Sequence, residues 1–304
     1  MSQIVIIGSI SMDLVMETNR LANQGETVFG ERFSMGPGGK GANQAVAVSR
    51  LAGDSGNNIY MFGSVGADIF GRDLLRHLEK ENINIDFIRK STKSTGVAQI
   101  TLYENDNRII YSSGANGDIA LDTWDIEWEI IKTSDLVILQ NEIAHEVNLN
   151  IAKFCHSQGV KVLYNPAPSR PTDIELLPYI TFITPNEYEC KELFPNKTVE
   201  EALMSLPNKL IITLGSRGVT FYDGDQIKII PAIPSSVVDT TGAGDTFSGA
   251  FAYAIVNNLT VEEGLKFAVI ASHLSVQRFG AQGGMPTLQM VKEDDYYEEK
   301  WNIE

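Results

Sequence analysis

Short apolar runs separated by helical patterns recur along most of this 304-residue chain, and they constrain its fold more than any other feature. Each run has four or five residues, is rich in Ile, Val and Leu, and is bounded by polar or turn-forming residues. A strand without a polar face is typical of a parallel sheet that helices cover on both sides. The runs are Ile4–Ile7, Leu136–Leu139, Val160–Tyr164, Ile180–Thr184 and Leu210–Leu214.

Helical patterns lie between these runs, at Gly41–Ala52, Gly71–Glu81 and Val147–Gln158. Alternation of strands and helices predicts an α/β fold, in which helices sandwich a mostly parallel sheet. The length allows one large domain or two small ones. Because the sequence contains no recognisable linker, repeat or low-complexity tract, it favours one domain.

Two early regions depart from this alternation and are more polar. Their strand-like segments are Thr27–Phe33, Thr95–Tyr103 and Arg108–Ser112, and Asn105-Asp106-Asn107 suits a hairpin turn between the last two. We predict a small sheet that projects from the main domain as a lid, with strands from about residues 11–35 and 95–113. The alternative is that these strands extend the edge of the main sheet.

Charge and cysteine content bound the function. A net charge of −15 argues against a basic surface for nucleic acids or anionic membranes, so any phosphate site must be built locally. Cys155 and Cys190 are too few for a disulfide framework or a zinc cluster. The first apolar run is too short for a signal peptide or a membrane span. We expect a cytoplasmic protein with two reduced thiols.

The run Asp239-Thr240-Thr241-Gly242-Ala243-Gly244-Asp245-Thr246-Phe247 points most directly to a chemistry. Apolar residues continue from it at helical spacing, at Phe247, Ala250, Phe251, Ala254 and Ile255. The glycines therefore fall at a helix N-terminus, where free N–H groups and the helix dipole attract anions. Asp245 beside such a site suits a base that accepts a proton from a hydroxyl attacking a bound phosphoryl group. The same residues also fit a glycine-rich turn with an ordinary capping Asp.

A second glycine-rich run, Gly36-Pro37-Gly38-Gly39-Lys40-Gly41-Ala42-Asn43-Gln44, precedes another helical pattern. It is not a Walker A loop, because the glycine spacing is too short and no Ser or Thr follows Lys40. Gly8-Ser9-Ile10-Ser11-Met12-Asp13 likewise lacks two glycines of the dinucleotide fingerprint. Lys40, Asn43 and Asp13 supply an ammonium, an amide and a carboxylate, which together suit the hydroxyls of a sugar.

Together, the two glycine-rich motifs resemble the signatures of the ribokinase family of PfkB-type carbohydrate kinases, from about Val5 to Pro286. Further landmarks are Asn165-Pro166-Ala167-Pro168, Thr184-Pro185-Asn186-Glu187-Tyr188-Glu189, Thr213-Leu214-Gly215-Ser216-Arg217-Gly218 and Gly280-Ala281-Gln282. The resemblance implies a single domain over residues 1–304, a three-layer α/β/α sandwich with a small β-sheet lid. It also implies ATP-dependent phosphorylation of D-ribose at O5, with Mg²⁺, activation by K⁺, and a homodimer formed through the lid.

The resemblance also implies roles for individual residues. Asp245 corresponds to the base, with Gly242, Ala243 and Gly244 as the anion hole. The implied sugar shell is Ser11, Asp13, Gly39, Lys40, Asn43, Glu142 and Asp245. On the phosphate side, Asn186 and Glu189 correspond to residues that organise Mg²⁺ through water, and Thr213, Gly215, Gly218 and Gly244 correspond to the nucleotide site. The loops for the monovalent cation match Asp239, Thr241, Ser275, Arg278, Gly280 and Gly284, mostly through backbone carbonyls.

One position departs from the family. Ser11 stands where many ribokinases have Asn, and a serine cannot span two hydroxyls as an amide can. Another acceptor, such as 2-deoxyribose, another sugar or a nucleoside, therefore stays open. So does a sugar-binding regulator without catalysis, although the intact Asp245 argues against it. His77, His145, His156 and His273 have no spacing for a catalytic triad or a metal site.

Overall fold

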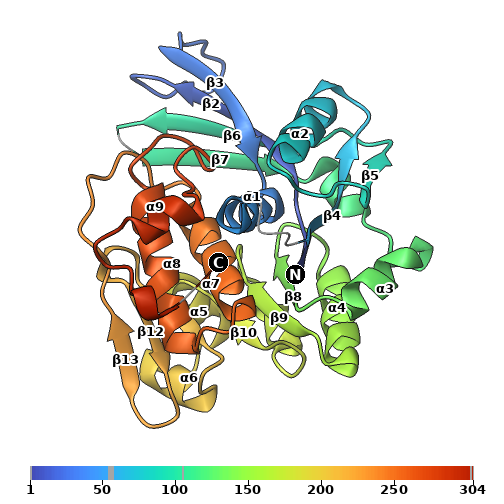
Figure 1. Cartoon of the computed structure of the whole chain (residues 1–304). Helices are drawn as coiled ribbons and strands as arrows, with labels where there is room; N and C mark the ends of the chain where they lie inside the picture. The colour runs from blue at the N-terminus through green and yellow to red at the C-terminus, as the bar shows by residue number, and fades with distance from the viewer. Residues whose placement is uncertain (1, 54–57, 105, 302, 304) are drawn as a thin grey trace.

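The computed structural model describes residues 2–53, 58–104, 106–301 and 303. Its central sheet has six strands in the order β10-β9-β8-β1-β4-β5, and every neighbouring pair is parallel (Figure 1). These strands are β1 (Gln3–Ile7), β4 (Asn58–Gly66), β5 (Ile88–Ser91), β8 (Leu136–Gln140), β9 (Lys161–Asn165) and β10 (Phe182–Ile183). The predicted parallel α/β fold is confirmed, although the strand expected over Ile180–Thr184 is limited to Phe182 and Ile183.

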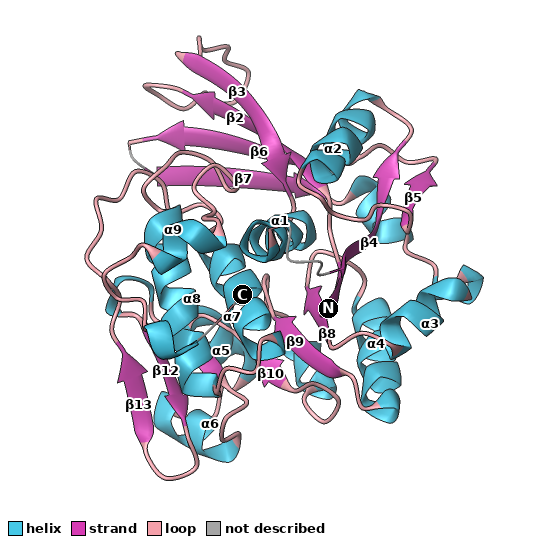
Figure 2. Ribbon diagram, in the orientation of Figure 1, coloured by secondary structure: helices cyan, strands magenta, loops and turns pink. Residues whose placement is uncertain are grey.

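Helices cover both faces of this sheet, which gives three layers (Figure 2). In β1, Ile4 and Ile6 face one hydrophobic core and Val5 and Ile7 face the other, as the period of two in a strand requires. The first core is closed by α1 (Lys40–Ala52), α2 (Ile69–Lys80), α7 (Ala243–Val256), α8 (Val261–Ser275) and α9 (Leu288–Lys292). The second is closed by α3 (Ile126–Lys132), α4 (His145–Gln158), α5 (Glu187–Leu193) and α6 (Val199–Ser205).

The expected strand at Leu210–Leu214 belongs to a separate sheet. β11 (Ile211–Thr213), β12 (Val219–Tyr222) and β13 (Ile227–Ile230) pair antiparallel in that order. In the part of the chain that the structure describes, two isolated parallel bridges, Ile183 to Leu210 and Asn186 to Thr213, join it to β10 and to the segment after β10. The buried, apolar character of the run was predicted correctly, but burial alone did not determine its pairing partner.

A third sheet, here called the projecting sheet, extends from the sandwich (Figure 1). It consists of β2 (Ser11–Glu17), β3 (Arg32–Gly38), β6 (Gly96–Tyr103) and β7 (Asp106–Ser112), in the order β3-β2-β6-β7. It is separate from the central sheet, so the edge-extension alternative is wrong. The strand expected at Thr27–Phe33 is also wrong, because β3 starts at Arg32 and pairs with β2 as far as Gly38. The expected turn residue Asn105 lies outside the described residues.

Short 3₁₀ helices complete the chain at Gly114–Asp118, Leu121–Thr123, Pro171–Leu176, Gly215–Arg217 and Glu299–Trp301. Among the residues described above, no helix has the length and apolar character needed to cross a membrane. Both cysteines are free and buried, which agrees with the expectation of two reduced thiols.

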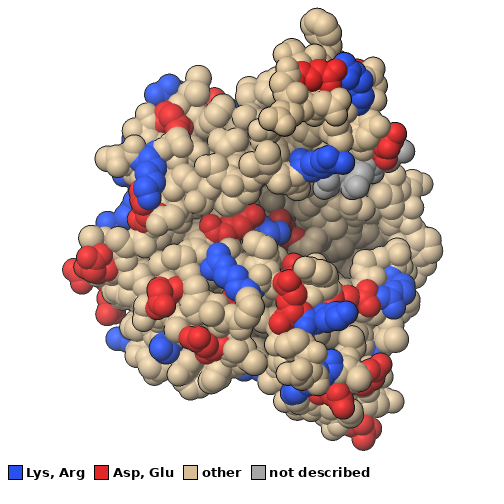
Figure 3. Space-filling view, turned by 180° about the vertical axis from the view of Figure 1, so that it is seen from behind, with Lys and Arg blue, Asp and Glu red and all other residues tan. Residues whose placement is uncertain are grey.

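The strand order of the central sheet indicates where a ligand site is expected. The chain leaves β1 toward β4 on one side, and β8 lies on the other, so the strand order reverses at β1. Ligands of open α/β sheets bind at the carboxyl ends of strands beside such a reversal. Figure 3 shows a deep hollow across one face of the molecule, with acidic and basic side chains gathered inside it.

Candidate active site

Two helix N-termini form the centre of the site. Gly39 caps α1 with a φ of 90°, and a Cβ there would lie 2.8 Å from the backbone nitrogen of Ser11. Gly242 caps α7 with a φ of 77°, and its Cβ would lie 2.2 Å from the carbonyl oxygen of Ala281. Only glycine allows this backbone conformation with such close approach. The predicted positions of both glycine-rich motifs are therefore confirmed.

Asp245 is buried in the first turn of α7, with 6% of its surface exposed. The side-chain amide of Asn43 donates to its Oδ2 and that of Gln44 donates to its Oδ1, each over 2.9 Å. Both donors come from the first turns of α1, so the contact between α1 and α7 fixes the carboxylate. An ionised carboxylate oxygen has two lone pairs, so each oxygen of Asp245 can still accept one further hydrogen bond.

Glu142 and Asp13, two more of the predicted sugar-binding residues, lie near Lys40 and Asp245. Glu142 follows β8, and its Oε2 accepts hydrogen bonds from the hydroxyl of Ser9 over 2.5 Å and the backbone N–H of Lys40 over 3.0 Å. Asp13 enters from β2 in the projecting sheet. Burial, followed by the charges of Glu142 and Asp245, raises the pKa of Asp13 to about 7, although Lys40 opposes this rise.

Lys40 is the cation within this group of carboxylates. Burial acts to lower the pKa of its ammonium, but the charges of Asp245, Glu142, Glu189 and Asp13 outweigh burial and raise it. The side chain therefore stays charged at neutral pH. Because Glu189 lies on the predicted phosphate side, Lys40 stands between the two halves of the site.

Two cavities open at these residues. One, of about 140 Å³, connects the predicted base with the predicted phosphate residues, and is lined by Lys40, Asn165, Ala167, Thr184, Asn186, Glu189, Thr213, Gly242, Gly244, Asp245 and Ser248. The other, of about 1210 Å³, separates the projecting sheet from the loops before α7 and after α8; Asp13 and His77 contribute to its wall. Gly215 and Gly218 lie in the turn between β11 and β12 and do not line the smaller cavity.

The open N–H groups at α7 differ in part from the predicted anion hole. The N–H of Ala243 donates to the carbonyl of Thr240 over 3.2 Å, so it is already used. Within the described part of the chain, the N–H groups of Gly244 and Asp245 form no backbone hydrogen bond. Gly244 and Asp245 are therefore the donors best placed to receive an anion at the N-terminus of α7.

Asn186 and Glu189 form a capping box at the start of α5. Asn186 Oδ1 accepts from the N–H of Glu189 over 2.9 Å, and Glu189 Oε2 accepts from the N–H of Asn186 over 2.8 Å. Burial raises the pKa of Glu189, and one of its oxygens stays available at the smaller cavity. Across the described ranges, no cluster of three or more His, Cys, Asp or Glu could hold a metal directly. One carboxylate oxygen fits Mg²⁺ that keeps most of its water.

The loops predicted for a monovalent cation meet beside Gly242. Asp239 Oδ1 accepts from the backbone and hydroxyl of Thr241, and its Oδ2 accepts from the N–H of Gly280 over 2.9 Å. Gly284 packs so closely on Ser275 that a Cβ would lie 1.8 Å from the Ser275 carbonyl oxygen. The side chain of Arg278 is exposed. Carbonyl and carboxylate oxygens are the ligands that hard cations prefer, so the loops fit such an ion.

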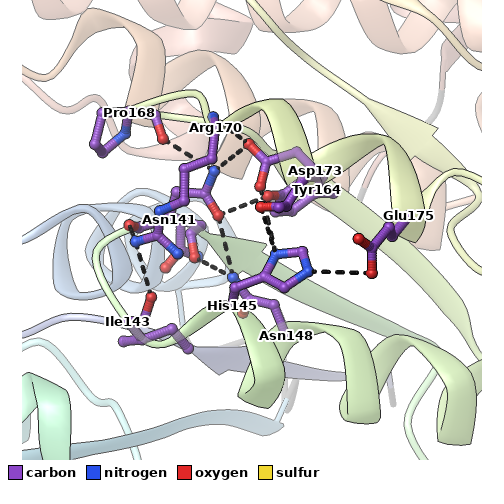
Figure 4. A network of polar contacts seen from close by, with 11 residues as sticks. Asn141, Ile143, His145, Asn148, Tyr164, Pro168, Arg170, Asp173 and Glu175 are labelled. Atoms are coloured by element: carbon purple, nitrogen blue, oxygen red, sulfur yellow. Dashed lines mark hydrogen bonds and ion pairs between the residues drawn. The ribbon is translucent and has the colours of Figure 1, made fainter. Parts of the chain in front are cut away.

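Several residues that support the site escaped the sequence analysis. Gln44 and Ser9 lie in motifs that were inspected for other reasons, and Gln282 belongs to a landmark without an assigned role. A buried polar network holds the segment around Glu142 (Figure 4). In it, Arg170 donates to the carbonyls of Asn141 and Ile143, on either side of Glu142.

The same network contains a fully buried carboxylate. Asp173 Oδ2 accepts from the side-chain amide of Asn141 over 2.5 Å and from the backbone N–H of Arg170 over 2.7 Å. His145, three residues after Glu142, lies 3.7 Å from Asp173 and 3.7 Å from Glu175 (Figure 4). His145 therefore belongs to the support behind Glu142. No local motif marks the network, because its members meet only in the folded chain.

Comparisons with known proteins agree with this geometry. The family model described as pfkB family carbohydrate kinase matches residues 1–288. A ribokinase of Lactococcus lactis subsp. lactis is 56% identical over 96% of this chain and 96% of its own length. A ribokinase of Bacillus subtilis is 44% identical over 96% of this chain and 99% of its own. The structure of Arabidopsis thaliana ribokinase complexed with ribose and ATP superposes with a TM-score of 0.86 at 33% identity, over 95% and 97% of the two chains.

Proposed function

The chain belongs to the pfkB family of carbohydrate kinases, and we propose that it transfers the γ-phosphate of ATP to O5 of D-ribose, giving D-ribose 5-phosphate and ADP. One observation carries the proposal. The buried carboxylate of Asp245 lies at the N-terminus of α7, accepts a hydrogen bond from Asn43, and lines one small cavity together with Lys40, Asn186 and Glu189. A base between a sugar site and an anion site suits phosphoryl transfer.

In this proposal each residue has a limited task. Asp13 and Glu142 accept hydrogen bonds from sugar hydroxyls and orient the ribose, while Asp245 accepts the proton of the attacking O5 hydroxyl. The N–H groups of Gly244 and Asp245 receive the charge of the transferring phosphoryl group, and Lys40 adds its positive charge. Asn186 and Glu189 would hold Mg²⁺ through water, and the ion would neutralise phosphate charge. Thr213, Gly215 and Gly218 would contact the nucleotide.

We further propose activation by K⁺ at the loops of Asp239, Thr241, Ser275, Arg278, Gly280 and Gly284. The carboxylate of Asp239 ties Thr241 to Gly280, and Gly242 packs against Ala281. An ion bound there would stiffen the backbone that carries the anion site. The projecting sheet exposes Phe33, Met35 and Ile110, which supports its proposed roles as a lid and as the contact in a homodimer.

A second acceptor, 2-deoxyribose, is favoured by one residue. Ser11 precedes Asp13 by two positions in β2, so both side chains point to the same face of the projecting sheet. The serine is shorter than the amide that many ribokinases have there, and it offers less hydrogen bonding to a sugar hydroxyl.

An ADP-release assay with Mg²⁺-ATP tests both acceptors, across ribose, 2-deoxyribose, fructose and adenosine, each with and without K⁺. The highest kcat/KM is expected for ribose, with faster turnover in K⁺. A higher kcat/KM for 2-deoxyribose would replace the proposed substrate. Absence of turnover with every acceptor would favour a sugar-binding regulator.

A further inference from the structure

Asp245 is linked to the wall of the large cavity through a line of three side chains. Asn43 donates to Asp245 over 2.9 Å, and the amide of Gln282 donates to Asn43 Oδ1 over 2.9 Å. The Oε1 of Gln282 lies 2.6 Å from the imidazole Nε2 of His77 on α2. Asp245, Asn43 and Gln282 are each at most 6% exposed, and Gln282 and His77 both line the large cavity. We call this line of four side chains the amide relay.

The hydrogen bonds of the amide relay all run in one direction, from His77 toward Asp245, and the donors and acceptors of each group determine it. Ionised Asp245 can only accept, so Asn43 must turn its NH₂ toward it and its oxygen toward Gln282. Gln282 must then donate to that oxygen, which turns its own oxygen toward His77. His77 must therefore donate from Nε2, either as the neutral Nε2–H tautomer or as the imidazolium.

The reverse direction of hydrogen bonding, from Asp245 toward His77, fits a protonated Asp245. When Asp245 carries a proton, it can donate to Asn43, and both amides can turn round so that Gln282 donates to Nε2 of His77. The two directions therefore correspond to the ionised and the protonated form of Asp245. The carboxylate of Glu81, 4.0 Å from Nε2 of His77, favours a hydrogen on that nitrogen, and a donor there matches the direction that leaves Asp245 free to accept a proton.

We propose that His77 is a positioning residue that keeps Asp245 ready to accept a proton by donating a hydrogen bond into the amide relay. The inference rests on the proposed role of Asp245 as the base. His77 shares the wall of the large cavity with Asp13, and its link to Asp245 runs through Gln282 and Asn43.

The far end of the amide relay is well supported. Arg50 of α1 donates to the backbone carbonyls of Gln282 over 2.6 Å and Met285 over 3.1 Å, which fixes the loop that carries Gln282. Arg50 also forms two hydrogen bonds to the carboxylate of Glu81, which lies 4.0 Å from His77 Nε2. Glu81 and Arg50 are thus the charged groups facing His77, and Lys40, Asp13 and Glu189 are those around Asp245.

An isosteric pair of substitutions tests the direction of the amide relay. In His77→Gln, an amide nitrogen can take the place of Nε2 and still donate, whereas in His77→Glu the ionised carboxylate can only accept. His77→Gln is expected to keep kcat within about 3-fold of wild type with the same pH profile. His77→Glu is expected to lower kcat roughly 10-fold at pH 7, and to move the acidic limb of the kcat profile up by about one pH unit, while KM for ATP is unchanged.

The matched control is Lys80→Gln, which removes one positive charge from the exposed end of α2 without touching the amide relay. It is expected to behave as wild type. Equal kcat and equal pH profiles for His77→Gln and His77→Glu would overturn the proposal, and so would a change in melting temperature alone. If His77→Glu does not fold, His77→Leu replaces it: a raised acidic limb supports the proposal and a wild-type profile overturns it. Full activity of Asp245→Asn would instead contradict the proposed base itself.

Discussion

Asp13 and Asp245 are two aspartates of one site, and their surroundings differ sharply. Asp245, at the base of the site, receives a side-chain amide on each carboxylate oxygen. Asp13 enters from the projecting sheet, and no residue within the described ranges donates a hydrogen bond to its carboxylate. Burial beside Glu142 and Asp245 raises its pKa to about 7. A satisfied carboxylate is fixed in place by the protein, whereas an unsatisfied one is stabilised by a ligand that donates to it.

This difference assigns separate tasks to the two residues. The protein itself fixes the carboxylate of Asp245. A base must be correctly oriented at the moment of reaction, so this suits a catalytic role. The carboxylate of Asp13 receives no such hydrogen bonds from the described part of the protein, and the hydroxyls of a sugar could supply them. We therefore expect substitutions at Asp245 to act on kcat and substitutions at Asp13 to act on sugar affinity.

The largest effect is expected for Asp245→Asn. The amide cannot accept a proton, so kcat should fall by roughly two or more orders of magnitude, the usual size of a general-base contribution. The dissociation constant of ribose, measured by calorimetry, should change only a few-fold, because the oxygen of the new amide can still accept a hydrogen bond from Asn43 or Gln44 and hold the side chain. A loss confined to sugar affinity would mean that the two aspartates have been assigned the wrong way round.

Asp13→Asn is expected to have the next largest effect. Replacing a charged acceptor by a neutral amide removes charge-assisted hydrogen bonds to the sugar, so KM for ribose should rise roughly 10- to 100-fold. At saturating ribose, kcat should stay within a few-fold of wild type. Steady-state kinetics over a wide range of ribose concentrations separates the two parameters. A large fall in kcat with an unchanged KM would contradict a role in sugar binding.

The two aspartates also differ in how far sequence alone could place them. Each lies in a motif that the sequence analysis singled out: Asp13 ends the run Gly8-Ser9-Ile10-Ser11-Met12-Asp13, and Asp245 lies at the predicted start of a helix. Their hydrogen-bond partners could not be predicted, because Gln44 is 201 residues from Asp245 and Gln282 is 239 residues from Asn43. Only the packing of α1 on α7 and on the loop after α8 brings them together.

The strands of the fold show the same limit. Buried parallel strands such as β1 and β8 are apolar apart from one terminal glutamine each, so composition reveals them. β3 pairs only with β2 at the edge of the projecting sheet, and much of it is exposed. Phe33 and Met35 alternate with polar residues but are exposed, and the strand continues through Gly36, Pro37 and Gly38, which have low strand propensity. Its extent therefore follows from pairing with β2 rather than from composition.

A smaller effect is expected for the pH dependence of sugar affinity. Ribose hydroxyls donate to ionised Asp13, so sugar binding favours the charged form and releases a proton from the neutral one. The dissociation constant of ribose should therefore rise as pH falls below about 7, by up to about 10-fold per pH unit. Calorimetry from pH 6 to 8, in buffers of different ionisation enthalpy, measures both the affinity and the released proton. Asp13→Asn should flatten this dependence, and an equally steep curve in that variant would assign it to another group.

The smallest effect concerns stability without a sugar. The pKa of Asp13 is about 7 in the folded chain against an ordinary value of 3.8, so between these limits the folded state binds more protons than the unfolded state. Its ionisation therefore destabilises the fold progressively as pH rises from about 4 to 7, and the cost is complete above that range. Asp13→Asn removes this cost, so its melting temperature should exceed that of wild type by a few degrees at pH 8 and match it near pH 4. Asp73→Asn, at an exposed position on α2, is the control and should show no such pH-dependent gain. A destabilised Asp13→Asn at pH 8 would mean that the protein satisfies Asp13 as fully as it satisfies Asp245, and the contrast between the two aspartates would be lost.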